Sequence, residues 1–146
     1  MFLAARSPEV YQAQFKNPLD VIPWLQQQET NLMNSFDAND WLYQKWAYER
    51  HDLGTTSGME GDTKKALESI KAKTLILLGT KDLLNPEWEP REAARSIRDV
   101  KVVAIRPESV TGHAAAGGAI PADVEFINRE TAAFLDQVTD GGKRLN

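Results

Sequence analysis

The sequence contains no cysteine, and this absence excludes several kinds of chemistry at once. Disulfides, thiolate nucleophiles and Cys-based zinc or iron–sulfur centres all need that side chain. Long apolar runs are also missing. The run from Leu75 to Leu78 falls far short of the roughly 20 residues of a helical membrane span. We do not expect residues 1–6 to act as a signal peptide, because their apolar stretch is short and no basic residue precedes it.

Basic residues are also fewer than acidic ones. The chain has 17 Lys and Arg against 21 Asp and Glu, a formal net charge of −4. A mildly acidic protein lacks the basic face that binding to nucleic acid or to an anionic membrane surface requires. The 146 residues fit one domain, and the ordinary apolar content favours a globular protein over a disordered one. These features predict a cytoplasmic protein without a nucleic-acid or membrane partner.

The first part of the chain has a helical pattern. Ser7, Pro8 and Glu9 form a typical helix start, and Asp37 and Asp62 are N-cap candidates for later helices. Helices are therefore predicted from Pro8, over about 20–34 and 37–52, and after Asp62. The aromatic residues of this part are expected to pack between the helices or, alternatively, to line an acyl pocket. They are Trp24, Trp41, Tyr43, Trp46 and Tyr48.

The pattern changes near residue 58, which divides the chain into a helical region over 1–58, an α/β segment over 59–140 and a tail over 141–146. The run Thr74–Leu78 predicts a strand that is buried on both faces, as in a parallel sheet. A helix is predicted over about 90–98, a second strand over 100–105 and a last helix from about Pro121. The fold class is therefore α/β, with a parallel β-α-β-α order. Two strands are few for such a sheet, so we expect the chain to be part of a larger protein or to receive strands from a partner.

An acid and a histidine follow the two predicted strands. Asp82 comes after the first, in Gly79-Thr80-Lys81-Asp82, and His113 comes after the second, in Thr111-Gly112-His113. The carboxyl ends of adjacent parallel strands lie at one edge of a sheet, where catalytic groups gather. A carboxylate there can accept a proton from imidazole Nδ1 and so orient a general base. Asp82 and His113 are the predicted catalytic residues, and the expected oxygen-to-nitrogen distance is about 2.6–3.2 Å.

Three segments resemble the C-terminal part of α/β-hydrolase-fold enzymes, within the homoserine O-acetyltransferase-like group. They are residues 36–52, which resemble a lid helix, residues 77–86 with their strand and acid, and Gly112-His113. The resemblance implies an α/β-hydrolase fold with the helical lid above the site, with Asp82 as the triad acid and His113 as the triad base. It also implies acetyl-CoA as an acyl-donor substrate, a small-molecule acceptor and no bound cofactor or metal.

The sequence departs from this group in two ways. The residues after His113 are Ala114-Ala115-Ala116-Gly117-Gly118, where the acetyltransferases commonly carry an acid and bulky apolar side chains. A related hydrolase or another acyltransferase fits equally well. The second departure is that no Gly-x-Ser-x-Gly nucleophile motif occurs; the nearest match, Gly54-Thr55-Thr56-Ser57-Gly58, has its serine shifted and no strand before it. The chain thus looks like the last 40% or so of a hydrolase-fold protein, an estimate from usual domain size.

Two hypotheses follow. In the first, the chain supplies the acid and base of a serine acyltransferase or hydrolase whose nucleophile lies elsewhere. In the second, it is a non-catalytic fragment or interaction module. In the first hypothesis the strand over 73–78 lacks one of its two neighbours, so we expect the chain to form a homodimer, to aggregate or to bind an N-terminal partner segment. A strictly monomeric chain would favour the second hypothesis.

Overall fold

The computed structural model describes residues 5–35 and 37–142, which form mostly helices and one two-stranded parallel sheet. The expectations for residues 1–4, for Phe36 and for the tail after Gly142 lie outside this part. None of the described helices is long and apolar enough to cross a membrane. The helices are α1 (Pro8–Gln14), α2 (Val21–Ser35), α3 (Ala38–Arg50), α4 (Thr63–Glu68), α5 (Trp88–Ala94) and α6 (Pro121–Gly142). The strands are β1 (Thr74–Leu78) and β2 (Val100–Ala104), and short 3-10 turns are η2 (Pro18–Asp20), η3 (Leu53–Thr55) and η4 (Gly112–Ala115).

Capping residues explain where the helices begin. The side chain of Asp37 accepts a hydrogen bond from the Asn39 N–H at 2.7 Å, and that of Asp62 accepts one from the Lys65 N–H at 3.0 Å. Each bond satisfies a backbone donor that a helix start leaves unpaired. Pro8 stands in the first turn of α1, where its missing N–H costs nothing. The predicted starts of these three helices are therefore confirmed.

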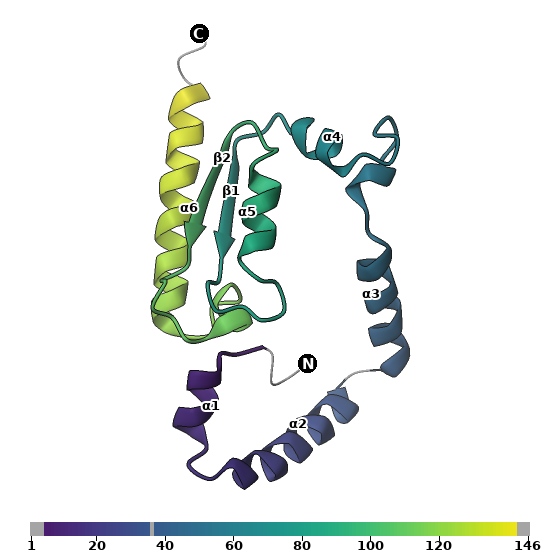
Figure 1. The fold of residues 1–146 in the computed structure, drawn as a ribbon. Coiled ribbons are helices and arrows are strands. Elements are labelled where there is room, and N and C mark those ends of the chain that lie inside the picture. Colours follow the sequence, from purple (N-terminus) through teal and green to yellow (C-terminus); the bar gives the residue numbers. More distant parts are fainter. Residues whose placement is uncertain (1–4, 36, 143–146) are drawn as a thin grey trace.

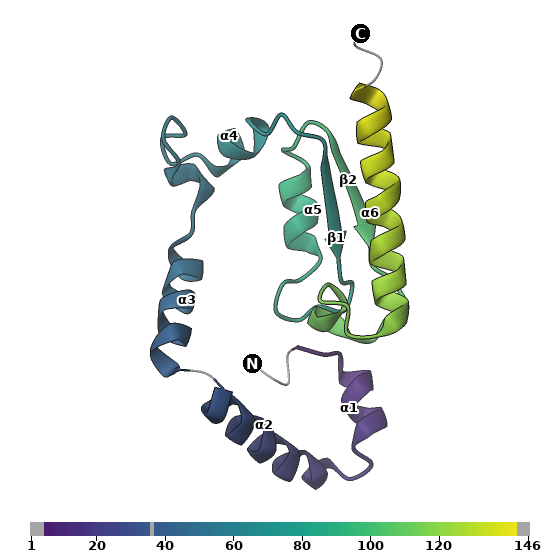
Figure 2. The same cartoon turned by 180° about the vertical axis from the view of Figure 1, so that it is seen from behind.

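The two strands are parallel neighbours, as the sequence predicts. They pair in register from Thr74 with Val100 to Leu78 with Ala104. Helices α5 and α6 flank the strand pair on opposite sides (Figures 1 and 2). This order places the carboxyl ends of both strands at the same edge, and the loops that leave this edge carry Asp82 and His113.

Two packing predictions are wrong. Strand β1 is half-buried along most of its length, and Leu78 is its one buried residue, because the described residues give it β2 as a single strand neighbour. The recurrence of Val124, Leu135 and Val138 at helical spacing predicts an inner stripe on α6, but all three are exposed. Apolar residues in this segment have less cover than a complete α/β domain gives them.

The predicted bounds of α5 are wrong by a few residues. The helix begins at Trp88, which leaves Pro90 inside the first turn, where proline is tolerated. It ends at Ala94 because the next N–H groups bond three residues back: Arg95 to Glu92, Ser96 to Ala93 and Ile97 to Ala94. These tighter bonds end the α-helical ladder. The spacing of Ala94 and Ile97 predicts that both face inward, and both are buried.

Helices α1, α2 and α3 form an open arc beside the α/β segment (Figure 1). The arc starts near the carboxyl ends of the strands and returns, through α4, at their other end. None of the three helices buries a residue. The helical spacing of Leu42, Trp46 and Leu53 predicts an apolar stripe on α3, but all three side chains are exposed, so this stripe is not part of a core.

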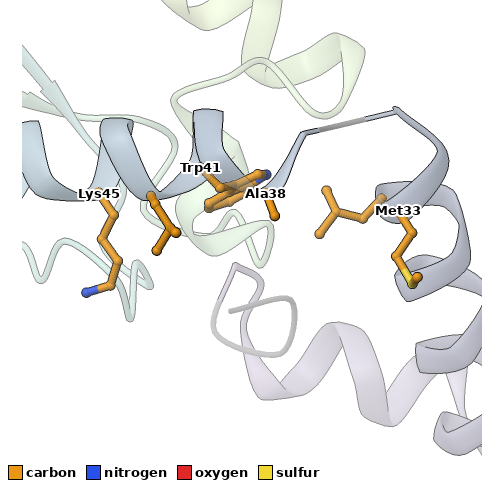
Figure 3. Close-up of a pocket in the computed structure, with 6 residues that line it drawn as sticks. Met33, Ala38, Trp41 and Lys45 are labelled. Carbon is orange, nitrogen blue, oxygen red and sulfur yellow. The ribbon is translucent and has the colours of Figure 1, made fainter.

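The aromatic residues of the arc have different surroundings. Trp24 packs edge-on against Tyr11 and Phe15, which joins α1 to α2, so the packing role predicted for it is confirmed. Trp41 instead lines an apolar cleft of about 470 Å³ between α2 and α3 (Figure 3). The lining residues are Leu32, Met33, Ala38, Trp41, Leu42 and Lys45.

Candidate active site

Asp82 and His113 meet at the carboxyl edge of the strand pair. The Asp82 Oδ2 atom lies 2.9 Å from His113 Nδ1, within the distance range predicted from the sequence. The Asp82 side chain is 8% exposed and the His113 side chain 42% exposed. The acid is therefore shielded from water, while the ring can reach a substrate. This is the geometry in which a carboxylate fixes the imidazole of a general base.

The loop after β1 holds the Asp82 carboxylate in place. Its Oδ1 atom accepts hydrogen bonds from the Leu84 N–H at 2.8 Å and the Asn85 N–H at 2.9 Å. Oδ2 is left to face the imidazole. With one oxygen fixed by two backbone donors, the carboxylate has little freedom to turn away from His113.

The two site loops touch through glycines. A Cβ atom on Gly79 would come within 2.9 Å of the Gly112 carbonyl oxygen. Gly112 has a φ of +62°, and a Cβ there would lie 3.0 Å from the Lys81 carbonyl oxygen. Glycine is required at Gly112 both for its left-handed backbone and for this close approach. The contact between backbones brings the acid loop within reach of the histidine.

We expect Gly112→Ala to destabilise the chain by about 2–4 kcal/mol, since it combines the cost of a left-handed alanine with a clash against fixed backbone. Gly58→Ala is the matched control. Gly58 also has a positive φ, of +85°, but a Cβ there meets nothing within 4 Å. The control should cost about 1 kcal/mol. Urea unfolding measures both, and equal losses would show that the loops do not depend on this contact.

A buried carboxylate anchors the loop that carries His113. Asp123 is completely buried, and its Oδ1 accepts a hydrogen bond from the Arg106 guanidinium at 3.1 Å. Its Oδ2 accepts from the hydroxyls of Ser109, at 3.1 Å, and Thr111, at 2.8 Å. These bonds tie the loop between β2 and η4 to the first turn of α6. One of them comes from Thr111, which stands two residues before His113. Nothing in the sequence pattern marks this cluster.

Residues 5–9 cross both site loops. The Ser7 N–H donates to the Val110 carbonyl at 3.3 Å, and the Ala5 carbonyl accepts from the Ala114 N–H at 3.2 Å. Lys81 Nζ lies 2.8 Å from Glu9 Oε1. The start of the helical arc is therefore attached to the acid loop and the histidine loop at once.

The Lys81 ammonium lowers the pKa of Glu9 from 4.5 to about 2. Because the pKa is lower in the folded chain than in the unfolded one, this pair stabilises the fold above about pH 4.5, and the contribution is lost as pH falls toward about 2. We expect Lys81→Met to raise the Glu9 pKa toward its usual range, measured by carboxyl NMR titration, because Lys81 is the largest of the groups that lower it. Lys101→Met, which removes the partner of Glu130, should leave the Glu9 value unchanged. The same Glu9 pKa in both variants would contradict the assignment.

A cleft of about 460 Å³ opens beside the Asp82–His113 pair. Its walls come from the end of β1, from α5 and from η4. Ten residues line it: Leu77, Leu78, Gly79, Asp82, Asn85, Glu89, Pro90, Ala93, His113 and Ala116. The cleft shares no lining residue with the Trp41 cleft between α2 and α3. An apolar wall with a few convergent polar groups is typical of small-molecule sites.

No serine of the sequence stands in a Gly-x-Ser-x-Gly motif, which would place it on an elbow turn between a strand and a helix. Ser57 lies in the exposed turn between η3 and α4, and no strand leads into it. Within residues 5–35 and 37–142, no three His, Cys, Asp or Glu side chains gather as metal ligands would. His51 directly follows α3, where its N–H donates to the Tyr48 carbonyl. Asp82 and His113 therefore have the geometry that a base and its orienting acid require, while the sequence offers no nucleophile on an elbow turn.

Two curated proteins are similar to this chain, and both are named homoserine O-acetyltransferase. The protein from Chloroherpeton thalassium is 29% identical over 131 residues, which cover 90% of this chain and 32% of the relative. The protein from Methanohalobium evestigatum is 30% identical over 105 residues, which cover 70% of this chain and 21% of the relative. The resemblance to this group that the sequence predicts is thus confirmed. The chain spans a third or less of the length of these relatives.

No protein-family model matches the chain. No solved structure matches it either. The similarity therefore rests on these two relatives, and it is consistent with a C-terminal fragment of their group.

Proposed function

We propose that this chain supplies the acid and the base of a serine-dependent acyltransferase with the α/β-hydrolase fold. The observation that carries the proposal is the 2.9 Å contact between Asp82 Oδ2 and His113 Nδ1 at the ends of adjacent parallel strands. The similarity to proteins named homoserine O-acetyltransferase supports the transferase class. The order acid then histidine along the chain is that of the α/β-hydrolases.

Each side chain has a role that follows from its position. With its Nδ1 proton held by Asp82, the His113 ring has a lone pair at Nε2, which takes the proton of a serine Oγ as that oxygen attacks the acyl carbonyl. Nε2–H then returns the proton to the leaving group. In the second half, Nε2 takes the proton of the acceptor hydroxyl, which attacks the acyl-serine. Asp82 stabilises the imidazolium in both steps.

The nucleophile belongs to a segment outside this sequence, on the same polypeptide or on a partner. The half-buried strand β1 and the apolar cleft beside it support this part of the proposal, because an added strand would cover both. A serine carried on a turn after that strand would reach the cleft at the carboxyl edge, where His113 lies.

The donor proposed for this site is acetyl-CoA and the acceptor is an alcohol such as homoserine. Acetyl-CoA is a substrate here, and the chemistry needs no bound cofactor. The small residue Ala116 lines the cleft together with His113, and water is the competing acceptor there. A hydrolase would use the same pair, and exclusion of water decides between the two reactions.

A hybrid enzyme tests the proposal. The matching region of the Chloroherpeton thalassium protein is replaced by this chain, and acetyl transfer from acetyl-CoA to homoserine is measured. We expect the hybrid to be active, and His113→Ala to lower kcat by at least about 10³-fold. His51→Ala is the matched control and should retain activity. A folded hybrid in which the two histidine variants behave alike would refute the proposal.

One set of observations favours the second hypothesis, an interaction module. Helices α1 to α3 bury none of their residues and expose large apolar side chains, including Met33 at 81% and Tyr48 at 74%. Such surfaces mark interfaces. In that case the hybrid would fold without activity, and the chain would associate through these helices.

A further inference from the structure

His113 Nδ1 faces a second polar group besides Asp82. The Asn85 side-chain nitrogen Nδ2 lies 3.3 Å from His113 Nδ1. Asn85 also donates its backbone N–H to Asp82 Oδ1 at 2.9 Å. One residue of the acid loop therefore contacts both members of the pair.

The two neighbours of His113 Nδ1 require opposite protonation states of this atom. A carboxylate oxygen accepts hydrogen bonds, so Asp82 needs a proton on Nδ1. An amide nitrogen donates them, so Asn85 Nδ2 needs a lone pair on Nδ1. A neutral imidazole satisfies one or the other, and the choice decides its tautomer. With the proton on Nδ1, Nε2 can act as a base; with the proton on Nε2, it cannot.

The Asn85 amide is oriented by a residue of the helical arc. Tyr48, in the last turns of α3, donates its hydroxyl to Asn85 Oδ1 at 3.3 Å. In this arrangement the amide oxygen faces the Tyr48 hydroxyl and the amide nitrogen faces His113. Without the Tyr48 bond, a half-turn of the amide would place Oδ1 beside the ring, where it accepts from Nδ1–H together with Asp82.

We propose that Tyr48 and Asn85 form a positioning relay that couples helix α3 to the tautomer of His113. With Tyr48 in place, the Asn85 amide competes with Asp82 for Nδ1 and lowers the fraction of His113 in the Nδ1–H form, the tautomer that is a base at Nε2. When α3 moves away, the amide turns and supports the Nδ1–H form. The inference rests on the proposed function, since it assigns a means of regulation to the same pair. Asn85 and Tyr48 act through His113 and do not react themselves.

Ring ¹⁵N NMR of the 146-residue chain tests the relay, at a pH where both histidine rings are neutral. Tyr48→Phe removes only the hydroxyl, and we expect the Nδ1–H to Nε2–H ratio of His113 to rise about threefold, the size of a lost weak hydrogen bond. Asn85→Leu, which removes the competing donor, should shift the ratio in the same direction. His51 gives signals in the same spectra and serves as an internal reference, since its tautomer ratio should not change.

Tyr43→Phe is the matched control, because Tyr43 is also an exposed tyrosine of α3 but contacts Trp46 and not the site. It should leave the His113 ratio at the wild-type value. An unchanged ratio in Tyr48→Phe, with backbone amide spectra that show an intact fold, would overturn the relay. So would a lower ratio in Asn85→Leu. The proposed function is judged separately, by the hybrid enzyme with His113→Ala.

Discussion

Replacing Asp82 with asparagine is expected to lower kcat for acetyl transfer in the hybrid enzyme by about 10⁴-fold. The amide keeps the size of the carboxylate and can still accept the two backbone hydrogen bonds from Leu84 and Asn85. It loses the negative charge that stabilises the imidazolium, and it can turn its nitrogen toward Nδ1 and so favour the wrong tautomer. The homoserine KM should change little, because the acid contacts the base and not the substrate.

Asp62→Asn is the control for this substitution. Asp62 caps α4 through a bond to the Lys65 N–H, and asparagine caps helices about as well. Its kcat should stay within a factor of two of the unmodified hybrid, a difference of about 0.4 kcal/mol. A D82N hybrid that keeps more than a tenth of the activity would contradict the assigned role of Asp82.

A large loss of stability is also expected when Asp123 is replaced. Replacing this completely buried carboxylate with alanine leaves the Arg106 guanidinium and the hydroxyls of Ser109 and Thr111 without their common acceptor. We expect the free energy of unfolding to fall by about 3 kcal/mol, because the partners stay behind in a site closed to water. Urea unfolding followed by circular dichroism measures the loss.

Glu108→Ala provides the matched control. Glu108 is the other carboxylate bound by Arg106, at 2.9 Å, but its side chain is 66% exposed. A solvated ion pair contributes little, so the variant should lie within about 0.5 kcal/mol of wild type. Equal losses in the two variants would show that Asp123 does not anchor the histidine loop.

The sequence is sufficient to predict the strand pair and the two polar residues that follow it. The apolar runs over 75–78 and 102–105 predict the two strands, and adjacent parallel strands bring Asp82 and His113 together. The helix starts at Pro8, Asp37 and Asp62 are predicted for the same reason: capping is a local effect, so local sequence reveals it.

Features that depend on distant residues could not be predicted. Asp123 stands in the first turn of α6, where an acid is favourable even on a surface, so nothing in the sequence marks it as buried. The contacts of residues 5–9 with the site loops join segments about 100 positions apart, which no periodicity records. The apolar stripe of α3 predicts a buried face. The helix sequence alone cannot tell which other part of the protein, if any, packs against that face.

The most direct test of the account asks where the proton of neutral His113 lies. In ring ¹⁵N spectra of the 146-residue chain, a bond from Nδ1–H to Asp82 predicts a substantial Nδ1–H population for His113, which falls sharply in Asp82→Asn while His51 is unchanged. A His113 ring that stays in the Nε2–H form in wild type, or that shows the same tautomer ratio in both proteins, would contradict the claim that Asp82 prepares His113 to act as a base.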